Sequence, residues 1–544
     1  MTTHERAPAQ QTYDMVIVGA GFAGLYMLHK ARILGLTARV FEAGPSVGGT
    51  WYWNRYPGAR VDIESQEYSY SFSSELEDDW KWSERYAAQP ELLRYLNHVA
   101  DRFDLRRDIS LETRVTEAIY DAGSNRWNVK TDKDENVSAR FCVMATGCLS
   151  APKQIDIPGA DTFRGDIYNT SSWPEQHPDF SGKRVGIIGT GSSSVQTITQ
   201  IAPEVGSLHI FQRTPNFSVP AHNGPADPEV FRQWHANREA NREAGRQHPI
   251  GIVAAVVTDK LTLETPAEER RRMYEERWAK GGFAFGGAFV DLLVTKEAND
   301  TFVDFVAEKV RAIVKDPEVA EKLIPRTYPV GSKRVCVDTG YFEVFNRDNV
   351  TLVDIAKAPV TVTPKGVKTG GVEYELDALI FGLGFDAMTG ALSKIDIRGR
   401  GGEALKDKWD GGPRTYLGLM VAGFPNLFLV TGPGSPSVLS NMVVSIEQHV
   451  DWISNCIAAM SGRQQDVIEA TPEAEDAWVA HVNEVADMTL YPRANSWYIG
   501  ANVPGKPRVF MPYVAGVDIY RQKCNEVAAN GYEGFALSSS ARSA

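Results

Sequence analysis

Short apolar runs that end on glycine-rich turns alternate with amphipathic stretches along the chain. The first run, residues 14–18, leads into a turn with Gly19, Gly21 and Gly24. Apolar side chains then recur at helical spacing, and a second run at residues 37–41 ends on Glu42. Short apolar runs are typical of buried parallel strands, whereas spacings of three and four residues are typical of helices. This stretch therefore predicts a strand–turn–helix–strand unit.

The same pattern returns further along the chain. Residues 184–188, which are apolar after Arg184, lead into Gly189 and Gly191, with Ser194 in place of a third glycine. The next apolar run, residues 208–211, ends on Gln212-Arg213-Thr214. Two such units predict an α/β fold with two Rossmann-like dinucleotide-binding domains, as in two-dinucleotide-binding flavoproteins.

Other periodic segments complete the predicted order of elements. Residues 90–103 carry one apolar face and predict a helix, and another helix is predicted from about Asn441. Further strands are predicted at residues 141–144, 350–353, 360–362 and 376–381.

Residues 222–328 are charge-rich and predict a helical insertion. Helical periodicity covers residues 266–278 and 301–314. Thr265, with Glu268 three residues later, predicts a capping box, and Pro266 would take the first helical position. The charges of this segment are typical of solvated helix faces.

These patterns divide the chain into five segments. We expect a first FAD-binding part at 1–150, a first NADP-binding part at 151–221, the helical insertion at 222–328, a second NADP-binding part at 329–381 and a second FAD-binding part at 382–544.

The residue that ends the second strand of each unit indicates which nucleotide binds. In such units the pyrophosphate lies on the glycine turn at the helix N-terminus. Glu42 would accept the ribose hydroxyls and disfavours a 2′-phosphate, which indicates FAD or NAD. Arg213 can pair with a 2′-phosphate, although a solvated arginine at a strand end is the alternative. The two units together predict FAD first and NADPH second.

Residues 48–62 join two glycines, several aromatic residues and an acid in one stretch. The sequence reads Gly48-Gly49-Thr50-Trp51-Tyr52-Trp53-Asn54-Arg55-Tyr56-Pro57-Gly58-Ala59-Arg60-Val61-Asp62. Glycines allow the backbone to approach a ligand closely, and aromatic side chains suit the wall of a site for a flat ring. A buried aromatic loop without a ligand is the alternative.

Composition and charge exclude several classes of protein. The net charge of −12, from 57 basic and 69 acidic residues, disfavours non-specific binding to nucleic acid. The five cysteines are scattered and show no zinc or redox spacing, so we expect free thiols and a cytoplasmic location. Residues 1–12 are polar, and no apolar run is long enough to span a bilayer. We expect no metal site, because the ten histidines include no His-Glu-x-x-His pair.

Two longer motifs resemble the signatures of the type I Baeyer–Villiger monooxygenases. Gly49-x-Trp51-x-x-x-x-Tyr56-Pro57-Gly58-x-x-x-Asp62 is complete. Phe163-x-Gly165-x-x-x-Asn169-x-x-x-Trp173-Pro174 is complete except that Asn169 replaces histidine. The resemblance covers nearly the whole chain. It is nearest to the group of the phenylacetone and cyclohexanone monooxygenases.

The resemblance implies an NADPH- and O2-dependent flavin monooxygenase that converts linear, aryl or cyclic ketones to esters or lactones. In the implied mechanism NADPH reduces FAD, O2 adds at flavin C4a, and the peroxide attacks the ketone to give a Criegee-type adduct. Arg334 would stabilise the negative charge, and Asp62 would position and tune Arg334. Without the resemblance, a basic pair on the surface would be the favoured interpretation of Lys333 and Arg334.

The motifs and the resemblance together predict the site residues. The predicted cofactor-binding residues are Gly19, Gly21, Gly24, Glu42, Gly49, Thr50, Trp51, Tyr56, Asp62, Gly189, Gly191, Ser192, Ser193, Gln196, Arg213, Thr214, Lys333, Met442 and Trp497. The predicted substrate-pocket residues are Ser437, Val438, Leu439 and Met442. The predicted partners are a small ketone and O2, with no nucleic acid, membrane or metal.

Departures from the family pattern leave two other functions open. Asn169, Ser194, Val335, Cys148 and the turn that begins at Gly382 all differ from the usual residues. A flavin monooxygenase acting on nitrogen or sulfur would not need Arg334. An uncoupled NADPH oxidase or a redox-responsive flavoprotein would consume NADPH without forming an oxygenated product.

Overall fold

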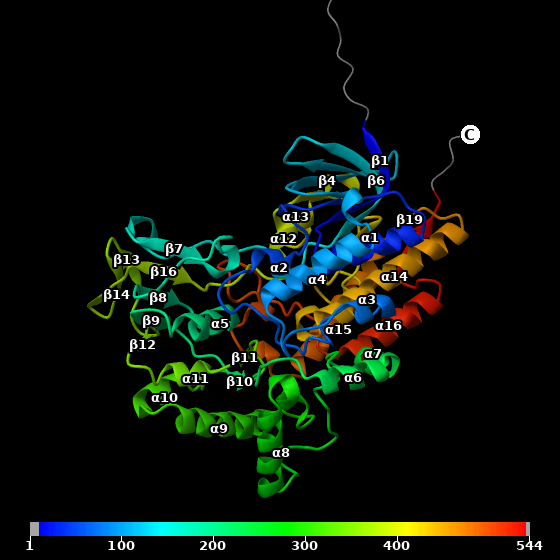
Figure 1. Cartoon of the computed structure of the whole chain (residues 1–544). Coiled ribbons are helices and arrows are strands. Elements are labelled where there is room, and N and C mark those ends of the chain that lie inside the picture. The colour runs from blue at the N-terminus through cyan, green and yellow to red at the C-terminus, as the bar shows by residue number, and fades with distance from the viewer. Residues whose placement is uncertain (1–9, 540–544) are drawn as a thin grey trace, which may run out of the picture.

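The computed structural model describes residues 10–539 of the 544-residue chain and has the predicted α/β architecture (Figure 1). Two sheets lie side by side, each packed against helices, and the helices of the insertion lie below them in Figure 1. The first nine residues of the predicted polar start lie outside the described residues.

The first sheet is built from both halves of the chain. Its strand order is β17-β4-β5-β6-β1-β2-β3, and β18 pairs with β6 next to the end of β5. The strands from β6 through β1 and β2 to β3 are parallel, and β4–β5–β6 is antiparallel. The bounds are β1 (Gln11–Val18), β2 (Ala38–Phe41), β3 (Ile109–Ser110), β4 (Val115–Asp121), β5 (Arg126–Thr131), β6 (Asn136–Met144), β17 (Asp396–Arg398) and β18 (Leu427–Leu429).

The second sheet is fully parallel, with the order β12-β9-β8-β16-β7. All carboxyl ends of its strands therefore lie at one edge, where α/β sheets bind ligands. The bounds are β7 (Asp166–Asn169), β8 (Arg184–Ile188), β9 (Ser207–Gln212), β12 (Val350–Asp354) and β16 (Ala378–Phe381). The strands predicted at 184–188, 208–211, 350–353 and 376–381 are confirmed. The strand predicted at 360–362 is β13 (Thr361–Thr363), in a small antiparallel sheet with β14 (Gly366–Thr369) and β15 (Val372–Glu375).

Helices follow both glycine turns and pack on the sheets. α1 (Phe22–Ile33) begins after Gly21, and α5 (Ser192–Ile201) begins after Gly191. α1 packs against α4 (Gln89–Arg102) and α14 (Met442–Gly462), as Figure 1 shows. The helices predicted at residues 90–103 and from about Asn441 are confirmed as α4 and α14. Asn441 caps α14 by accepting a hydrogen bond from Val443 N at 3.1 Å.

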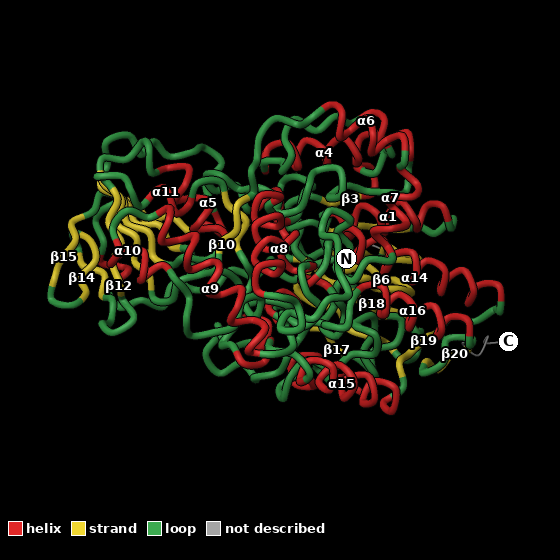
Figure 2. Tube along the Cα trace, turned by 90° about the horizontal axis from the view of Figure 1, so that it is seen from below, coloured by secondary structure: helices red, strands yellow, loops and turns green. Residues whose placement is uncertain are grey.

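The insertion is helical, but two of its details differ from the prediction. Its helices are α6 (Pro228–Ala236), α7 (Arg238–Arg246), α8 (Ala267–Lys280), α9 (Lys296–Ile313) and α10 (Pro317–Leu323), red in Figure 2. The predicted capping box is wrong, because the Thr265 hydroxyl donates to Leu261 O at 2.8 Å and Pro266 is the N-cap. α9 begins earlier than predicted, because Thr295 caps it by accepting from Ala298 N.

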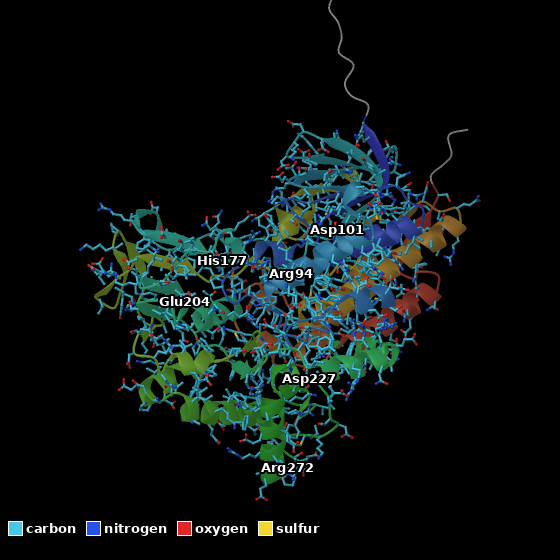
Figure 3. The ribbon with its side chains drawn as sticks, viewed as in Figure 1. Arg94, Asp101, His177, Glu204, Asp227 and Arg272 are labelled. Carbon is cyan, nitrogen blue, oxygen red and sulfur yellow. The ribbon has the colours of Figure 1, made fainter. Side chains whose placement is uncertain are left out.

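The insertion presents charged side chains to solvent. Asp227, labelled in Figure 3, caps α6 by accepting from Glu229 N at 2.8 Å. Arg272, near the tip of α8 in the same view, is 68% exposed and lies 3.8 Å from Glu276. These contacts agree with the predicted solvated helix faces.

Two segments that connect the sheets are paired with each other. Pro152 and Phe385 form an antiparallel bridge. Asp386 N donates to Ala151 O at 2.9 Å, and Met388 N donates to Cys148 O at 2.8 Å. The chain therefore crosses between the sheets twice at one place.

No helix in the described part of the chain combines the length and the apolar composition that crossing a bilayer requires.

Candidate active site

The first glycine turn forms a cradle without side chains at the N-terminus of α1. A Cβ on Gly24 would lie 1.8 Å from Gly19 O, so only glycine allows this close packing of helix and strand. Gly21 faces Gly49, because a Cβ on Gly21 would lie 3.3 Å from Gly49 Cα. No side chain caps α1, and its first turn carries no acid. The free N–H groups of this turn fit the pyrophosphate of FAD.

Glu42 lies at the end of β2, next to this cradle. Its Oε2 accepts from Ala20 N at 2.8 Å, and its Oε1 accepts from Gly44 N at 2.7 Å. Burial raises the pKa of Glu42, and these amides offset part of that effect. The carboxylate therefore holds together the two loops that surround the cradle.

The motif at residues 49–62 passes from the first domain to the second. Gly49 and Thr50 begin α2 (Thr50–Trp53), and the Trp51 ring is buried beside Tyr68 at 5.8 Å. The Tyr56 hydroxyl donates to Gln196 Oε1 on α5 at 2.9 Å. This signature therefore connects the two nucleotide-binding domains.

Arg334 and Asp62, which are far apart in sequence, form an ion pair. Arg334 Nε donates to Asp62 Oδ2 at 3.1 Å, and its Nη2 donates to the same oxygen. Arg334 Nη1 donates to Val438 O at 3.1 Å. The guanidinium is thus fixed by an acid on one side and by the predicted substrate loop on the other.

Aromatic side chains enclose the rest of Arg334. Its guanidinium lies 4.6 Å from the centre of the Phe283 ring, which comes from the insertion. Burial opposes its charge, but Asp62, Tyr498 and Tyr491 raise its pKa above the usual value. Arg334 therefore stays charged, and 27% of its side chain remains exposed. Burial also raises the pKa of Tyr498 to about 12, an effect that Arg334 partly offsets.

The second glycine turn forms a similar cradle at the N-terminus of α5. No side chain caps this helix, its first turn carries no acid, and a Cβ on Gly191 would have no neighbour within 4 Å. The Ser193 hydroxyl lies 3.1 Å from that of Thr170, and the Ser192 hydroxyl lies 3.6 Å from Cys336 Sγ. Open space beside an uncapped helix end fits the pyrophosphate of NADP.

Two departures from the family pattern compensate for each other beside this turn. Ser194 is fully buried, and its hydroxyl has no hydrogen-bond partner among residues 10–539. A Cβ on Gly382 would lie 1.8 Å from Ser194 Oγ. Gly382 therefore provides the space that Ser194 needs.

Three basic side chains converge at the carboxyl edge of the second sheet. Arg213 follows β9, and Lys333 lies 4.4 Å from the centre of the Tyr328 ring. Burial and the nearby Arg213 charge lower the pKa of both Lys333 and Lys153. Within the described residues no carboxylate lies within 4.0 Å of these three cations. This group of unpaired cations fits a bound phosphate. Lys153 was not predicted from the sequence as a member of it.

The loop at 437–442 lies between Arg334 and the end of β6. Ser437 has a φ of 43°, and its hydroxyl lies 3.6 Å from Cys148 Sγ. Val438 is buried, and its cluster includes Leu439, Met442, Trp497 and Tyr498. All the predicted pocket residues therefore lie in one group around Arg334.

Trp497 belongs to a loop that is attached to the paired linkers. Its ring centre lies 4.3 Å from that of Tyr498. Lys506 Nζ lies 2.6 Å from Asp386 Oδ1 and donates to Ala387 O at 2.7 Å. These contacts attach the loop to one of the segments by which the chain crosses between the sheets.

Asn169 has a local structural role in this fold. Its Oδ1 accepts from Ser171 N at 3.0 Å and from the Ser171 hydroxyl at 2.8 Å. It thereby caps the short helix Thr170–Ser172. Thr170 of this helix contacts the Ser193 hydroxyl of the second glycine turn. An amide oxygen suits this position, because asparagine is a strong N-cap.

The structure brings together most of the predicted site residues. It also adds groups that the sequence did not predict. Phe283, the carbonyl of Val438, Tyr498 and Lys153 also face the site. No local motif marks Phe283, Lys153 or the carbonyl of Val438, because each reaches the site through tertiary packing. Within residues 10–539, no three or more His, Cys, Asp or Glu side chains are grouped as a metal site requires.

Known proteins resemble this chain over almost its whole length. Residues 16–223 match a family described as pyridine nucleotide-disulphide oxidoreductase. A Baeyer–Villiger monooxygenase from Pseudooceanicola batsensis is 44% identical over 96% of this chain and 95% of its own. A phenazine N-monooxygenase from Lysobacter antibioticus is 42% identical over 97% of each chain. A solved structure of oxidized steroid monooxygenase bound to NADP is 51% identical, with a TM-score of 0.94 over 97% of this chain and 100% of that one.

Proposed function

The chain belongs to the flavin-dependent Baeyer–Villiger monooxygenases, and from this premise we propose the part that each site residue takes in the reaction. The protein is an FAD- and NADP(H)-dependent monooxygenase that converts ketones to esters or lactones. When bound, FAD reduced by NADPH supplies the oxygen atom, taken from O2, that is inserted next to the carbonyl carbon.

Arg334 is the residue that stabilises the developing negative charge on the carbonyl oxygen. The observation that carries this role is its enclosure: Asp62, Val438 O and the Phe283 ring fix the guanidinium from three sides. A permanent cation that is already fixed in place stabilises an oxyanion without having to reorganise during the reaction. Asp62 acts through Arg334 as a positioning residue.

The FAD site comprises the first glycine turn and the motif after it. The uncapped end of α1 supports phosphate binding by Gly19, Gly21 and Gly24. We assign the ribose hydroxyls to Glu42, which follows β2 beside this turn. The remaining residues that we assign to this site are Gly49, Thr50, Trp51, Tyr56, Asp62 and Met442.

The NADP(H) site comprises the second glycine turn and the three cations. Arg213, Lys333 and Lys153 bind the 2′-phosphate of the nucleotide. Because NADPH carries this phosphate and NADH does not, we expect a preference for NADPH. The remaining residues that we assign to this site are Gly189, Gly191, Ser192, Ser193, Gln196, Thr214 and Trp497. Ser437, Val438, Leu439 and Met442 line the ketone pocket.

We also propose the five-segment division given above and a cytoplasmic location. All five cysteines are buried and unpaired, which is typical of a reducing compartment. The same observation leaves no cysteine pair for disulfide chemistry.

The test is product analysis with Arg334→Ala. Purified FAD-bound protein, NADPH, O2 and a panel of linear, aryl and cyclic ketones should give esters or lactones. Arg334→Ala should form almost none, while Arg326→Ala, at a 49% exposed arginine paired with Glu321, should match the wild type. Ester formation at the wild-type rate by Arg334→Ala would disprove the proposed role.

Oxygenation of nitrogen or sulfur is the second candidate, because one relative is named as an N-monooxygenase. That reaction does not need a fixed cation. Retained oxidation of an amine or thioether by Arg334→Ala, with no ester from any ketone, would favour it. Release of all oxygen as peroxide would instead identify an uncoupled oxidase.

A further inference from the structure

Glu67 is a buried carboxylate close to the active site that no step described above uses. It lies five residues after Asp62 and is 4% exposed. Its Oε2 accepts from Val253 N at 2.6 Å, and its Oε1 accepts from Ala254 N at 3.1 Å. A buried carboxylate is costly unless such donors satisfy it. The two amides therefore hold residues 253–254 firmly against the Asp62 segment.

The backbone of Glu67 joins a third segment to these two. Asn441 Nδ2 donates to Glu67 O at 2.8 Å, and Asn441 N donates to Ile250 O at 2.8 Å. Asn441 is fully buried and caps α14. Glu67 and Asn441 thus connect the segment after Asp62, the loop at 250–255 and the start of the substrate loop's helix.

The loop at 250–255 forms one wall of a small cavity beside Asp62. Ile252, Ala254 and Ala255 line this cavity together with Asp62 and with Phe283, the ring on which Arg334 lies. Ile252 and Ala255 also pack on Ile63. A shift of this loop would therefore move the surroundings of the Asp62–Arg334 pair.

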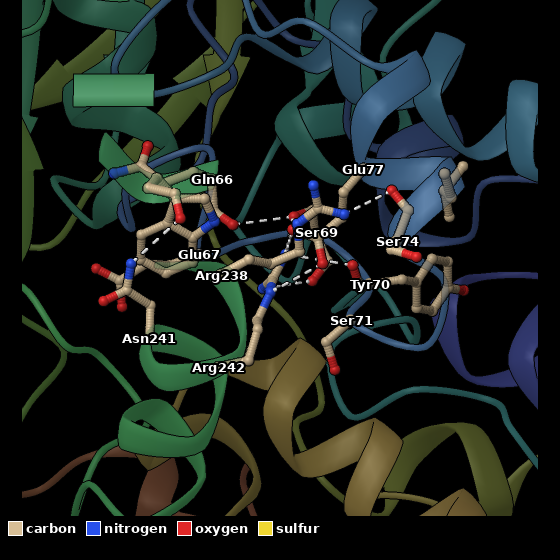
Figure 4. Close-up of polar contacts among 12 residues, drawn as sticks. Gln66, Glu67, Ser69, Tyr70, Ser71, Ser74, Glu77, Arg238, Asn241 and Arg242 are labelled. Atoms are coloured by element: carbon tan, nitrogen blue, oxygen red, sulfur yellow. Dashed lines mark hydrogen bonds and ion pairs between the residues drawn. The ribbon is translucent and has the colours of Figure 1, made fainter. Parts of the chain in front are cut away.

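The turn that carries Glu67 has a rigid base on its other side, as Figure 4 shows. Arg242 of α7 donates to Ser69 O at 3.1 Å and to Ser69 Oγ at 2.8 Å, and its Nη2 lies 3.0 Å from Glu77 Oε2. Arg242 and Glu77 are both buried. Glu67 therefore extends from a fixed turn toward the loop.

We propose that Glu67 is a positioning residue that sets the shape of the ketone pocket by holding the loop at 250–255 against Asp62 and Asn441. This proposal rests on the pocket assigned above. Glu67 is not among the residues that we assign to the cofactor sites or to the oxyanion, so we expect its effect on ketone binding and coupling.

Glu67→Gln is the decisive variant, because it keeps the shape of the side chain. The amide has one acceptor oxygen and would turn its NH2 group toward a backbone N–H. We expect the KM for a ketone to rise about tenfold, with the KM for NADPH and the FAD content unchanged. We also expect more peroxide per NADPH consumed.

The control is Glu91→Gln. Glu91 is likewise buried and accepts from a backbone amide and a hydroxyl, Ser83 N at 2.9 Å and Ser83 Oγ at 2.7 Å. It should lower the Tm as Glu67→Gln does, but leave the KM for the ketone as in the wild type. Equal changes in this KM for both variants would overturn the proposal.

The pH dependence provides a second readout. Burial raises the pKa of Glu67 to about 7, against the effect of the Val253 and Ala254 amides. Below about pH 7 the protonated acid has fewer acceptor sites, so the wild-type KM for the ketone should rise. Glu67→Gln should show no such rise. The other charged or titratable groups around Glu67 and its loop are Glu64, Arg85, Tyr86, Arg242, His248 and Lys280.

Hydrogen exchange separates this proposal from the proposed function. Glu67→Gln should lose amide protection at residues 250–255 and not across the whole domain. Unchanged protection there would overturn the role of Glu67 even if the wild type forms esters. Failure of the wild type to form any ester would instead disprove the function in the preceding subsection.

Discussion

At the scale of single residues, Ser194 and Gly382 show how two departures can make one intact site. Ser194 fills the position of the third glycine, and its hydroxyl occupies the place of a side chain at 382. Because Gly382 has an ordinary backbone conformation, its role is to leave space and not to adopt a positive φ. Ser194 and Gly382 therefore do not favour the alternative of an uncoupled oxidase or a redox-responsive flavoprotein.

A double-mutant cycle tests this pairing. Gly382→Ala alone should destabilise the protein by about 1–3 kcal/mol, because the new methyl group would overlap the Ser194 hydroxyl. Ser194→Gly combined with Gly382→Ala should recover most of that loss. Thermal unfolding of the four proteins measures the coupling. Purely additive effects would contradict the proposed contact.

The second prediction concerns Asp62, whose one oxygen accepts from two nitrogens of Arg334. Asp62→Asn removes the charge that holds the guanidinium. Ester formation should fall by roughly tenfold to a hundredfold, because a misplaced cation stabilises the oxyanion less. NADPH consumption and FAD content should persist, and measuring all three separates positioning from cofactor loss. Loss of FAD from Asp62→Asn would indicate a different role.

At the scale of elements, the nucleotide cradles could be predicted because their chemistry lies in contiguous residues. Each glycine turn follows its own strand and opens its own helix, so local spacing is sufficient. The surroundings of Arg334 could not be predicted in the same way. Phe283 comes from the insertion and Val438 O from the segment before α14, and a backbone carbonyl has no signature in the sequence. The capping box at Thr265 is wrong because the Thr265 hydroxyl donates to Leu261 O and does not accept from a backbone N–H of the helix.

Helix α14 carries a buried histidine that gives the third prediction. His449 Nδ1 accepts from Thr431 N at 2.9 Å, and burial lowers the pKa of His449 to about 3. The unfolded chain binds a proton near its ordinary pKa, whereas the fold does not. This residue therefore makes stability fall as pH decreases from about 6.5 toward about 3.

His449→Gln should reduce that dependence, because glutamine offers an acceptor but does not titrate. The histidine accounts for up to about 1.4 kcal/mol of stability per pH unit in this window. Unfolding temperatures measured at several pH values for both proteins test the prediction. Parallel curves for the two proteins would show that His449 is not responsible.

At the scale of the whole molecule, the paired linkers and the loop around Trp497 join the two domains at one place. Lys506 connects that loop to Asp386, and Asn502 Nδ2 donates to Phe385 O at 2.8 Å. Tyr56 adds a contact from the first domain to α5 of the second. The two nucleotide sites are thus connected at their shared edge.

Lys506→Met gives the fourth prediction, because it removes the ion pair at an 11% exposed side chain but keeps most of its apolar length. The loop at 494–512 should be cleaved faster by protease, and a larger share of NADPH should end as peroxide. Lys523→Met, at an exposed pair with Glu526, is the matched control. Identical cleavage patterns for the two variants would contradict the role of Lys506.

The placement of β18 beside β6 has a consequence for biosynthesis. Residues 142–144 acquire this neighbour only after residues 427–429 have left the ribosome, so the growing chain must carry an open sheet edge through much of translation. Unpaired edges of this kind invite aggregation. Expression should therefore be more sensitive to translation speed and to chaperone supply than the stability of the finished enzyme would suggest.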